Sequence, residues 1–418
     1  MTRSPAPATA TPRTALSVED ARHSILSSLR PVDGWASVAI RDALGRVLAK
    51  DVIAPHNVPA HDNSAMDGYA VSSADCQGTG ETPLKIVGTA MAGNAFSGLI
   101  GPGQAVRIMT GAMLPRGADC VIPQEDTVRA DTESVVLRGP LRAGDNIRRA
   151  GEDLTHGAPA LTAGTRIGPA ELGLIASLGI AEVQVRRRLR VAFFSTGDEV
   201  ASIGHPLAPG QIYDSNRYTL FGALTRLGCE LIDMGVIPDR PAALEDAFTR
   251  AARNADVILT SGGVSVGEAD FIKDMVNRLG QVDFWKLNIK PGRPMAFGCI
   301  GDTWMFGLPG NPVAVMVTFY QFVQDALLTL MGVTPLPERP TLPARCLADI
   351  RKRPGRREFI RAIVRQQDGD WIVTPTGAQG SGVLRSMADA NCFIVLDETN
   401  AGVTAGDAVA VQLFEGIV

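Results

Sequence analysis

The sequence predicts a multidomain protein in which a doubly wound, mostly parallel α/β domain is combined with two β domains. Residues 187–334 alternate short apolar β-forming runs with helical patterns, as in a parallel sheet wrapped by helices. Residues 57–149 are rich in glycine and contain several short β runs. A proline-rich linker, 334–340, precedes about eighty residues whose pattern favours a closed, barrel-like β domain.

Length and charge limit the possible functions. The chain has 418 residues, enough for roughly two to four domains. Its net charge of −4 argues against nucleic acid as the main partner. The six cysteines are scattered and are expected to be buried thiols in a reducing compartment. The five histidines do not have metal-ligand spacing, so a zinc site is not expected.

Neither the N-terminal segment nor the longest apolar segment of the chain indicates a membrane protein. Residues 1–15 are rich in Ala, Pro and Thr, do not resemble a secretory signal, and are predicted to be a disordered tail. The longest apolar segment, 312–331, contains Gln321, Gln324 and Asp325, and therefore favours a core helix over a membrane span. We expect a cytoplasmic protein.

The first helix and strand have local signals. Ser17 and Asp20 form a variant capping box, which predicts a helix that ends near Leu29. Residues 44–53 are predicted to form a strand. A further helix is expected over 169–178, because a glycine follows directly after it.

The glycine-rich region contains two polar segments of interest. Asp67 lies in a tight polar run where it either closes a turn or directs a carboxylate into a cleft. Thr110 ends a predicted strand just before a glycine. Arg148 and Arg149 precede two acidic residues, and the simplest interpretation is a surface ion-pair loop of small energetic value. The strands expected here are 84–89, 105–109, 120–123 and 135–137.

The α/β region should place several distinctive loops on one edge of its sheet. Ligands of open α/β sheets bind at the carboxyl ends of the strands. Asp239 is a predicted N-cap of the helix that begins at Pro241, and Asn311 of the helix that begins at Pro312. The loops that follow strands are 195–199, 238–239, 261–263, 286–293 and 308–311.

Two of these loops carry features that suit an anion: one has a pair of glycines, and the other has positively charged side chains. Gly262 and Gly263 offer backbone amides that can turn towards an anion. Lys286, Lys290 and Arg293 follow what we take to be the neighbouring strand, with prolines stiffening the turn. Together with nearby carboxylates, this pattern indicates a phosphate or oxyanion held beside a divalent metal. A plain βαβ turn with solvated charges is the alternative.

In the C-terminal region, an Asp-Gly pair at 368–369 predicts a β-hairpin. The basic cluster 351–357 either protects a strand edge or lends a guanidinium to an anion across an interface.

Taken together, the motifs resemble the molybdopterin molybdotransferase (MoeA) family, which includes the E domain of gephyrin. The resemblance extends from Leu16 to the C-terminus, and no Gly-x-Gly-x-x-Gly dinucleotide motif is present in the sheet region. The segments that carry it are 62–70, 107–112, 146–153, 195–199, 261–270, 290–294 and 307–312.

The resemblance implies an elongated homodimer with four domains per chain. It also implies insertion of molybdate into adenylylated molybdopterin, with magnesium-assisted release of AMP, in a cleft between the α/β domain of one protomer and the glycine-rich domain of the other. The expected domains are a discontinuous dimerisation domain (16–56 and 150–186), the inserted β domain (57–149), an α/β domain like molybdopterin adenylyltransferase (187–334) and the C-terminal β domain (335–418).

Site residues are carried over from the resemblance by position. Asp67 and Thr110 would reach in from the partner, and Asp198 would orient its loop. The oxyanion positions are Lys290, Arg293, Pro294, Arg356 and Ser381, with Arg148 also assigned to substrate. The phosphoanhydride would be bound by Ser261, Gly262, Gly263 and Lys286. Magnesium would be bound by Glu199, Asp239 and Asp270, although Asp239 could serve only as a helix cap.

Two positions depart from the family pattern. Ala314 stands where many relatives have serine, and Arg293 replaces a common lysine, so the affinity for molybdate is expected to differ and tungstate remains an alternative ion. Molybdopterin adenylyltransferase and molybdoenzymes are possible partners. A non-catalytic scaffold protein of the same architecture is the alternative function.

Overall fold

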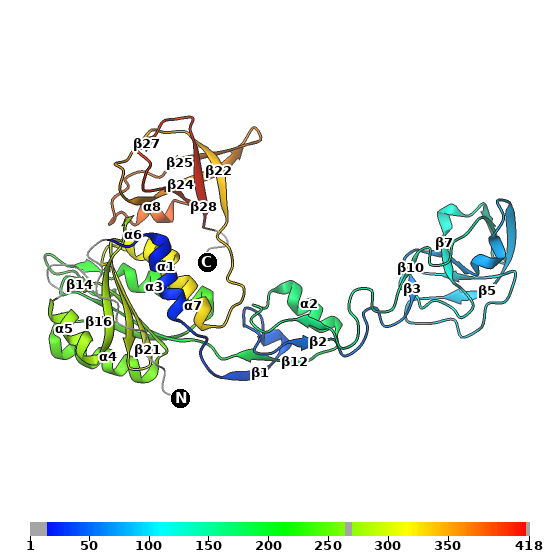
Figure 1. Ribbon diagram of the computed structural model, residues 1–418, viewed down its shortest axis with the longest axis horizontal. Helices are drawn as coiled ribbons and strands as arrows, with labels where there is room; N and C mark the ends of the chain where they lie inside the picture. The colour runs from blue at the N-terminus through cyan, green and yellow to red at the C-terminus, as the bar shows by residue number, and fades with distance from the viewer. Residues whose placement is uncertain (1–14, 264–269, 415–418) are drawn as a thin grey trace.

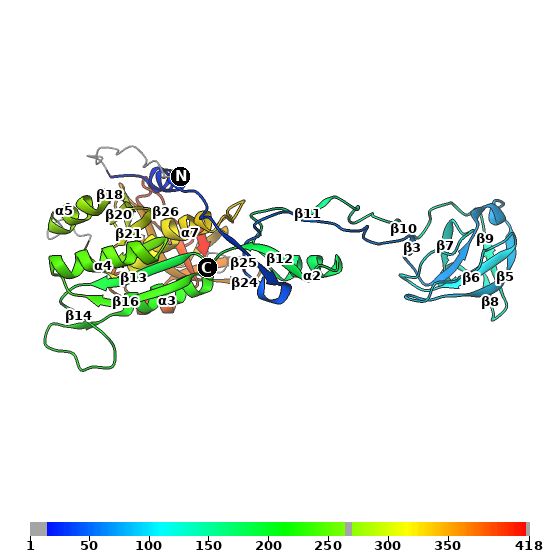
Figure 2. The ribbon, with the colours of Figure 1, turned by 90° about the horizontal axis from the view of Figure 1, so that it is seen from below.

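The computed structural model describes residues 15–263 and 270–414, the side chains of residues 270–272 excepted, as an elongated molecule (Figure 1). The α/β domain and the C-terminal β domain lie together at one end. The inserted β domain lies at the far end, and a small domain around α2 (Pro169–Ser177) lies between them. The turned view in Figure 2 shows the same separation.

A six-stranded mixed sheet forms the centre of the α/β domain. The first four strands in its spatial order are parallel, whereas β20 runs antiparallel to both of its neighbours. The order is β16 (Glu230–Ile237), β13 (Arg190–Thr196), β17 (Val257–Ser261), β21 (Thr303–Leu308), β20 (Pro294–Ile300) and β18 (Gly280–Lys286).

Both faces of this sheet are covered, which confirms the doubly wound prediction. Because side chains alternate along a strand, Phe193 and Phe194 of β13 enter different cores. Phe193 packs with α3 (Ser215–Leu227), and Phe194 packs with α4 (Pro241–Asn254). Helix α5 (Asp270–Leu279) joins the second core through Met275.

The apolar segment 312–331 forms a helix in the core, as predicted. The helix runs through α6 (Pro312–Thr318), a π-helical turn, η4 (Phe319–Val323), and α7 (Gln324–Leu330). Among the described residues it is the one helix long and apolar enough to span a membrane, and 83% of it is buried inside the protein. Helix α1 (Val18–Ser28), capped by the Ser17 hydroxyl as predicted, packs on it.

The C-terminal domain is a closed five-stranded barrel. Its β24–β25 turn has Asp368 and Gly369 at φ values of 50° and 89°, as the predicted Asp-Gly hairpin requires. The short strand β19 (Ile289–Lys290) leaves the α/β domain and pairs with β24, joining the two domains. Around the barrel the strands are β24 (Arg357–Gln367), β25 (Asp370–Pro375), β22 (Thr341–Cys346), β28 (Ala408–Leu413) and β26 (Cys392–Leu396), with β23 (Ile350–Arg351), β27 (Gly402–Val403) and α8 (Arg385–Ala388) outside it.

Two distant stretches of chain build the small domain. Strand β1 (Trp35–Ala39) pairs with β12 (Glu182–Arg186), and β2 (Val52–Ile53) pairs with β11 (Pro159–Leu161). The strand predicted over 44–53 is wrong for most of its length. A turn at Gly45, with φ of 75°, and isolated bridges replace it after η1 (Ile40–Asp42).

The inserted domain is a β structure, and the four strands predicted in it are confirmed. Its main sheet has the order β7-β4-β6-β5-β9-β8. These strands are β7 (Cys120–Pro123), β4 (Gly68–Val71), β6 (Gln104–Ile108), β5 (Glu81–Ala90), β9 (Ser134–Arg138) and β8 (Arg129–Ala130), accompanied by η2 (Ser73–Cys76), η3 (Gln124–Asp126) and the pair β3 (Asn63–Ser64) and β10 (Ile147–Arg148).

Candidate functional site

The loop after β17 lies in close contact with the end of β13. Gly262 has φ of 93°, and a Cβ there would lie 2.6 Å from the Thr196 carbonyl oxygen, so only glycine fits. The Gly262 amide donates to the Leu308 carbonyl at 3.1 Å. The Gly262 amide is therefore used within the protein in this structure, whereas the role of Gly263 as an anion donor stays a prediction.

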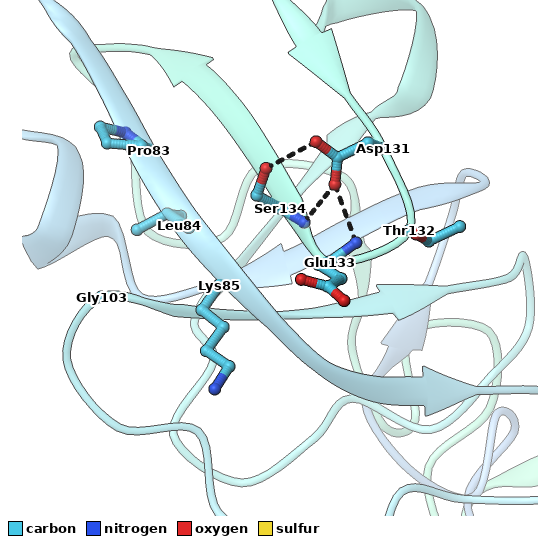
Figure 3. A pocket seen from close by; sticks show the side chains of 8 residues that line it. All are labelled: Pro83, Leu84, Lys85, Gly103, Asp131, Thr132, Glu133 and Ser134. Carbon is cyan, nitrogen blue, oxygen red and sulfur yellow. Dashed lines mark hydrogen bonds between the residues drawn. The ribbon is translucent and has the colours of Figure 1, made fainter.

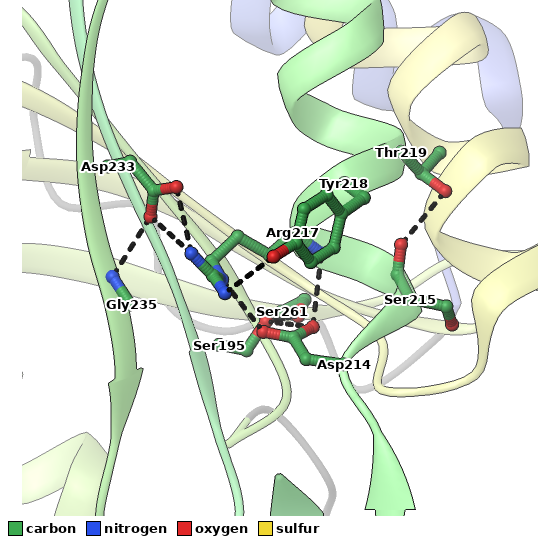
Figure 4. A network of polar contacts seen from close by, with 9 residues as sticks. All are labelled: Ser195, Asp214, Ser215, Arg217, Tyr218, Thr219, Asp233, Gly235 and Ser261. Atoms are coloured by element: carbon green, nitrogen blue, oxygen red, sulfur yellow. Dashed lines mark hydrogen bonds and ion pairs between the residues drawn. The ribbon is translucent and has the colours of Figure 1, made fainter. Parts of the chain in front are cut away.

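A buried polar network lies under this loop (Figure 4). The Ser195 hydroxyl donates to Asp214 Oδ1 at 2.9 Å and lies 2.9 Å from the Ser261 hydroxyl. Asp214 also accepts the amide and Nε of Arg217, and Arg217 pairs with Asp233 at 2.8 Å. Ser261 is therefore committed to holding β17, β13 and α3 together.

This network was not predicted from the sequence. Its one usable signal was Asp214 directly before a helix, because Asp is a favoured N-cap residue.

Carboxylates from two loops meet at the same edge. Asp198 and Glu199 are exposed after β13, in the loop before the short pair β14 (Val200–Ala201) and β15 (Ile212–Tyr213). The Asp239 amide donates to Asp198 Oδ1 at 3.3 Å, so the loops after β13 and β16 touch. The N-cap of α4 is Arg240, which makes the predicted capping role of Asp239 wrong.

These carboxylates are a partial fit to a magnesium site. Asp270 starts α5, but its side chain lies outside the described residues. Within the described part of the chain, no group of three or more His, Cys, Asp or Glu is placed to hold a metal. Magnesium usually needs only one or two carboxylates, because substrate phosphates and water supply the rest. Of the three predicted magnesium ligands, Glu199 and Asp239 are the two whose side chains the structure describes, and they lie in neighbouring loops at this edge.

Lys286 lies farther from the glycine loop than predicted. Strands β17 and β18 follow one another in sequence, but β21 and β20 lie between them in the sheet. At about 4.8 Å per strand, β17 and β18 are about 14 Å apart. Lys286 and Gly263 therefore cannot share one phosphate oxygen, although both lie on the carboxyl edge.

A cavity of about 280 Å³ lies where the α/β domain meets the barrel. Lys290 and Pro291 line it from the α/β side, and Arg351, Glu358 and Arg361 line it from the barrel. Lys290 Nζ lies 3.2 Å from Glu358 Oε2. The cavity therefore combines cations from two domains.

Arg361 is the buried cation of this cavity. It is 1% exposed, and it donates to the Ser386 hydroxyl and the Gly380 carbonyl at 3.0 Å each. Burial lowers its pKa to about 10, and no carboxylate is among its contacts in the described chain. A buried guanidinium without a carboxylate partner is unusual, and Arg361 lies in the strand that forms the wall of the cavity.

Arg361 is a cavity residue that was not predicted from the sequence. Arg356, which the resemblance assigns to the oxyanion, is exposed in the turn before β24 and is not among the residues that line this cavity, so its role stays a prediction. The signal for Arg361 was present in the sequence as one arginine inside the apolar run Phe359 to Val364. An arginine among buried apolar residues of a strand is rare, because burial of an unpaired charge is unfavourable, and it therefore indicates a specific role.

The remaining oxyanion positions surround the start of α6. The Ser381 carbonyl accepts the Val313 amide at 3.0 Å, so its loop lies against that helix. A Cβ at Gly292 would lie 2.8 Å from Thr318 and 3.4 Å from the Ala314 carbonyl, so the 290–293 loop packs on the same helix. Arg293 is exposed, and Pro294 begins β20.

Asp67 and Thr110 form a pair in the inserted domain. The amide and hydroxyl of Thr110 both donate to Asp67 Oδ1 at 2.7 Å and hold the pKa of Asp67 below its ordinary value. Both residues are exposed. Figures 1 and 2 place this domain at the far end of the chain from the α/β domain, so one chain does not bring this pair to the cavity.

The nearby arginine loop differs from its prediction. Arg149 pairs with Asp62 at 2.7 Å, and only its amide reaches Glu152. Arg148 is exposed in β10.

A larger hollow of about 650 Å³ lies on the inserted domain (Figure 3). Asp131 in its wall accepts the amides of Glu133 and Ser134 and the Ser134 hydroxyl, which closes the β8–β9 turn. None of the predicted site residues lines it.

Fold and site define a multidomain α/β protein with a cavity, lined by charged side chains, between its α/β domain and a terminal barrel. Family comparison makes the assignment more specific. Residues 16–179 match the MoeA N-terminal region (domain I and II), 192–329 match a probable molybdopterin binding domain, and 343–414 match the MoeA C-terminal region (domain IV). The chain belongs to the MoeA family, which confirms the resemblance and the predicted fold class.

Individual relatives agree over nearly the whole length. Molybdopterin molybdenumtransferase of Haemophilus influenzae is 43% identical over 96% of this chain and 100% of its own. The Bacillus subtilis protein of the same name is 36% identical over 90% of this chain and 89% of its own. The solved molybdopterin biosynthesis MoeA protein of Pyrococcus horikoshii OT3 has a TM-score of 0.82 at 27% identity, over 96% of this chain and 100% of that one.

Proposed function

We propose that this chain is a molybdopterin molybdenumtransferase that inserts molybdate into adenylylated molybdopterin and releases AMP in molybdenum cofactor biosynthesis. The observation that carries the proposal is the cavity between the α/β domain and the barrel, which is lined by Lys290 from one domain and by Arg351 and Arg361 from the other. The names of the curated relatives favour this transferase over a non-catalytic scaffold protein.

Molybdate is the substrate for which the cavity is suited. It is a doubly charged tetrahedral oxyanion, and it needs convergent donors from fixed directions. Arg361 is held by Ser386 and Gly380, so its guanidinium is oriented before an anion arrives. Lys290 supplies a second charge on a mobile stem. Ser381 and the exposed Arg293 would add further donors from neighbouring loops.

The adenylylated molybdopterin would bind along the carboxyl edge of the sheet. Gly263 and Lys286 would contact it at opposite ends of that edge, about 14 Å apart, in agreement with a long substrate. Magnesium would be held by Glu199, Asp239 and Asp270, with Asp198 supporting the loop. When bound, it would offset charge on the leaving phosphate.

The site is proposed to be composite. Asp67 and Thr110 would come from the inserted domain of a second protomer, because their own domain lies far from the cavity. The oligomer would be a homodimer in the cytoplasm. An adenylyltransferase would supply its substrate, and apo-molybdoenzymes would receive its product.

Release of AMP tests the proposal. The protein should release AMP from adenylylated molybdopterin when both molybdate and magnesium are present. Arg361→Met should reduce this rate at least about hundredfold, because a charge donor to the oxyanion is lost. Arg345→Met, exposed on the same barrel and outside the cavity lining, is the matched control and should stay within about twofold. No AMP above a blank, or equal losses in both variants, would contradict the assignment.

A further inference from the structure

Glu358 is an unexpected acid in a cavity suited to anions. Its side chain is 10% exposed, and both carboxylate oxygens lie near Lys290 Nζ, at 3.2 and 3.3 Å. In the described part of the chain, Lys290 is the one polar partner of this carboxylate. The contact is built into the fold, because Lys290 and Glu358 are paired in register between β19 and β24.

The two partners differ in their freedom to move. Glu358 is buried in a strand that is paired on both sides, by β19 and by β26. The Lys290 side chain is 50% exposed and ends a two-residue strand. A flexible stem lets an ammonium group exchange partners, whereas a short carboxylate in a sheet stays in place.

The charges in the cavity do not balance once an oxyanion enters. The cavity lining carries three cations, Lys290, Arg351 and Arg361, and two carboxylates, Asp349 and Glu358. Without a ligand, Lys290 pairs with Glu358. A doubly charged oxyanion brings the negative charges to four, against these three cations. An incoming anion must therefore attract Lys290 away from a carboxylate that remains nearby.

We propose that Glu358 is the resident counter-ion of Lys290, and that an oxyanion binds only by displacing it. This inference rests on the proposed function, since it assumes that the cavity is the oxyanion site. Coulomb attraction to Lys290 and Arg361 is twice as large for a doubly charged ion as for a singly charged ion of the same size. Glu358 thus acts as a filter that excludes singly charged anions and lowers the affinity for molybdate.

Two tetrahedral oxyanions of similar size and different charge test the filter. Molybdate and perrhenate, with charges of −2 and −1, are titrated by calorimetry into the full-length protein. The unchanged protein should bind molybdate and show no perrhenate binding. Glu358→Gln removes the competing charge, so molybdate should bind about tenfold more tightly and perrhenate binding should become measurable. Glu358→Asp keeps the charge and should keep the exclusion of perrhenate.

The control variant changes charge without touching the cavity. Asp370→Asn removes an exposed carboxylate from the far turn of the same barrel and should change both affinities by less than about twofold. Equal tightening by Asp370→Asn would show a general field effect and overturn the proposal. Weaker or unchanged molybdate binding in Glu358→Gln would overturn it as well.

Failure of the underlying assignment gives a different result. Lys290→Met and Arg361→Met should each weaken molybdate binding at least about tenfold. If neither does, the cavity is not the oxyanion site and the proposed function loses its main support. If both do while Glu358→Gln has no effect, only the counter-ion role is refuted. Thermal melting of each variant shows that it is folded before titration.

Discussion

At the residue scale, Gly262 shows how backbone geometry specifies one amino acid. Gly262→Ala would place a Cβ 2.6 Å from the Thr196 carbonyl at φ of 93°. We expect a loss of about 1–3 kcal/mol in the free energy of unfolding, measured by urea denaturation. Gly301→Ala has a φ of 59° and nothing within 4 Å, so it should lose only about 1 kcal/mol. Equal losses would mean that the contact with Thr196 is unimportant.

Asp256 is a carboxylate whose effect depends on pH. Burial raises its pKa, but hydrogen bonds from the Arg187 guanidinium at 2.7 Å and the Arg190 amide at 2.9 Å outweigh burial and hold the pKa below its ordinary value. A depressed pKa stabilises the fold above the unfolded pKa of about 3.9, and this contribution disappears as pH falls through the folded pKa.

Asp256→Asn should therefore lose about 2 kcal/mol at neutral pH. The difference from the unchanged protein should be constant above about pH 5 and should shrink below about pH 4. Denaturant unfolding across that range measures it. A difference that grows on acidification would contradict the assigned sign.

The kind of ligand was easier to predict from the sequence than the particular residues that line the cavity. The sequence indicated an anion held by lysines and arginines on a strand-end edge, and a cavity with Lys290 is present. Arg356 was carried over from the family resemblance, whereas Arg361 in the wall of the cavity was not predicted. Which side chains line the cavity depends on the packing of the barrel, and residue pattern alone does not describe that packing.

At the element scale, one buried ionic group joins four segments. Asp325 in α7 is 2% exposed and pairs with Arg22 of α1 at 2.6 Å and with Arg339 of the linker at 2.7 Å. Arg339 also donates to the side chain and the carbonyl of Gln321 in the π-helical turn, and Gln321 donates to Gln412 of β28. A π turn leaves a carbonyl free of its usual partner, and Arg339 binds one.

Arg339→Met should destabilise the protein by about 3 kcal/mol, because it leaves the buried Asp325 with one partner and the Gln321 carbonyl with none from Arg339. Thermal or urea unfolding provides the measurement. The matched change Arg278→Met removes an exposed pair at 3.7 Å and should cost at most about 1 kcal/mol. Similar losses in both variants would show that burial adds nothing here.

Elements with strong local signals were predictable, and spatial order was not. The caps at Ser17 and the Asp368 turn are local features, and both were predicted correctly. The positions of β20 and β21 between β17 and β18 depend on long-range pairing. Since that order separates Lys286 from the glycine loop, the predicted single phosphate site becomes an extended edge.

At the scale of the whole molecule, the long separation between the inserted domain and the cavity demands an explanation. Asp67 and Thr110 are hydrogen-bonded to each other, and their domain lies far from the cavity of their own chain. A composite site in a symmetric dimer would use them, and each dimer would then contain two identical sites.

Mixing two inactive variants tests this arrangement. Asp67→Asn alters the inserted-domain contribution, and Arg361→Met alters the cavity. Each homodimer should be nearly inactive. If the site spans two protomers, a mixed dimer contains one site with both changes and one with neither. Random mixing during co-expression should then restore about a quarter of normal AMP release, because about half of the dimers are mixed and each has one intact site.

If each site were built within one chain, the mixture would stay as inactive as its components. Co-expression of two differently changed cavity residues, Arg361→Met and Lys290→Met, serves as the control, since no mixed dimer can then contain an intact site.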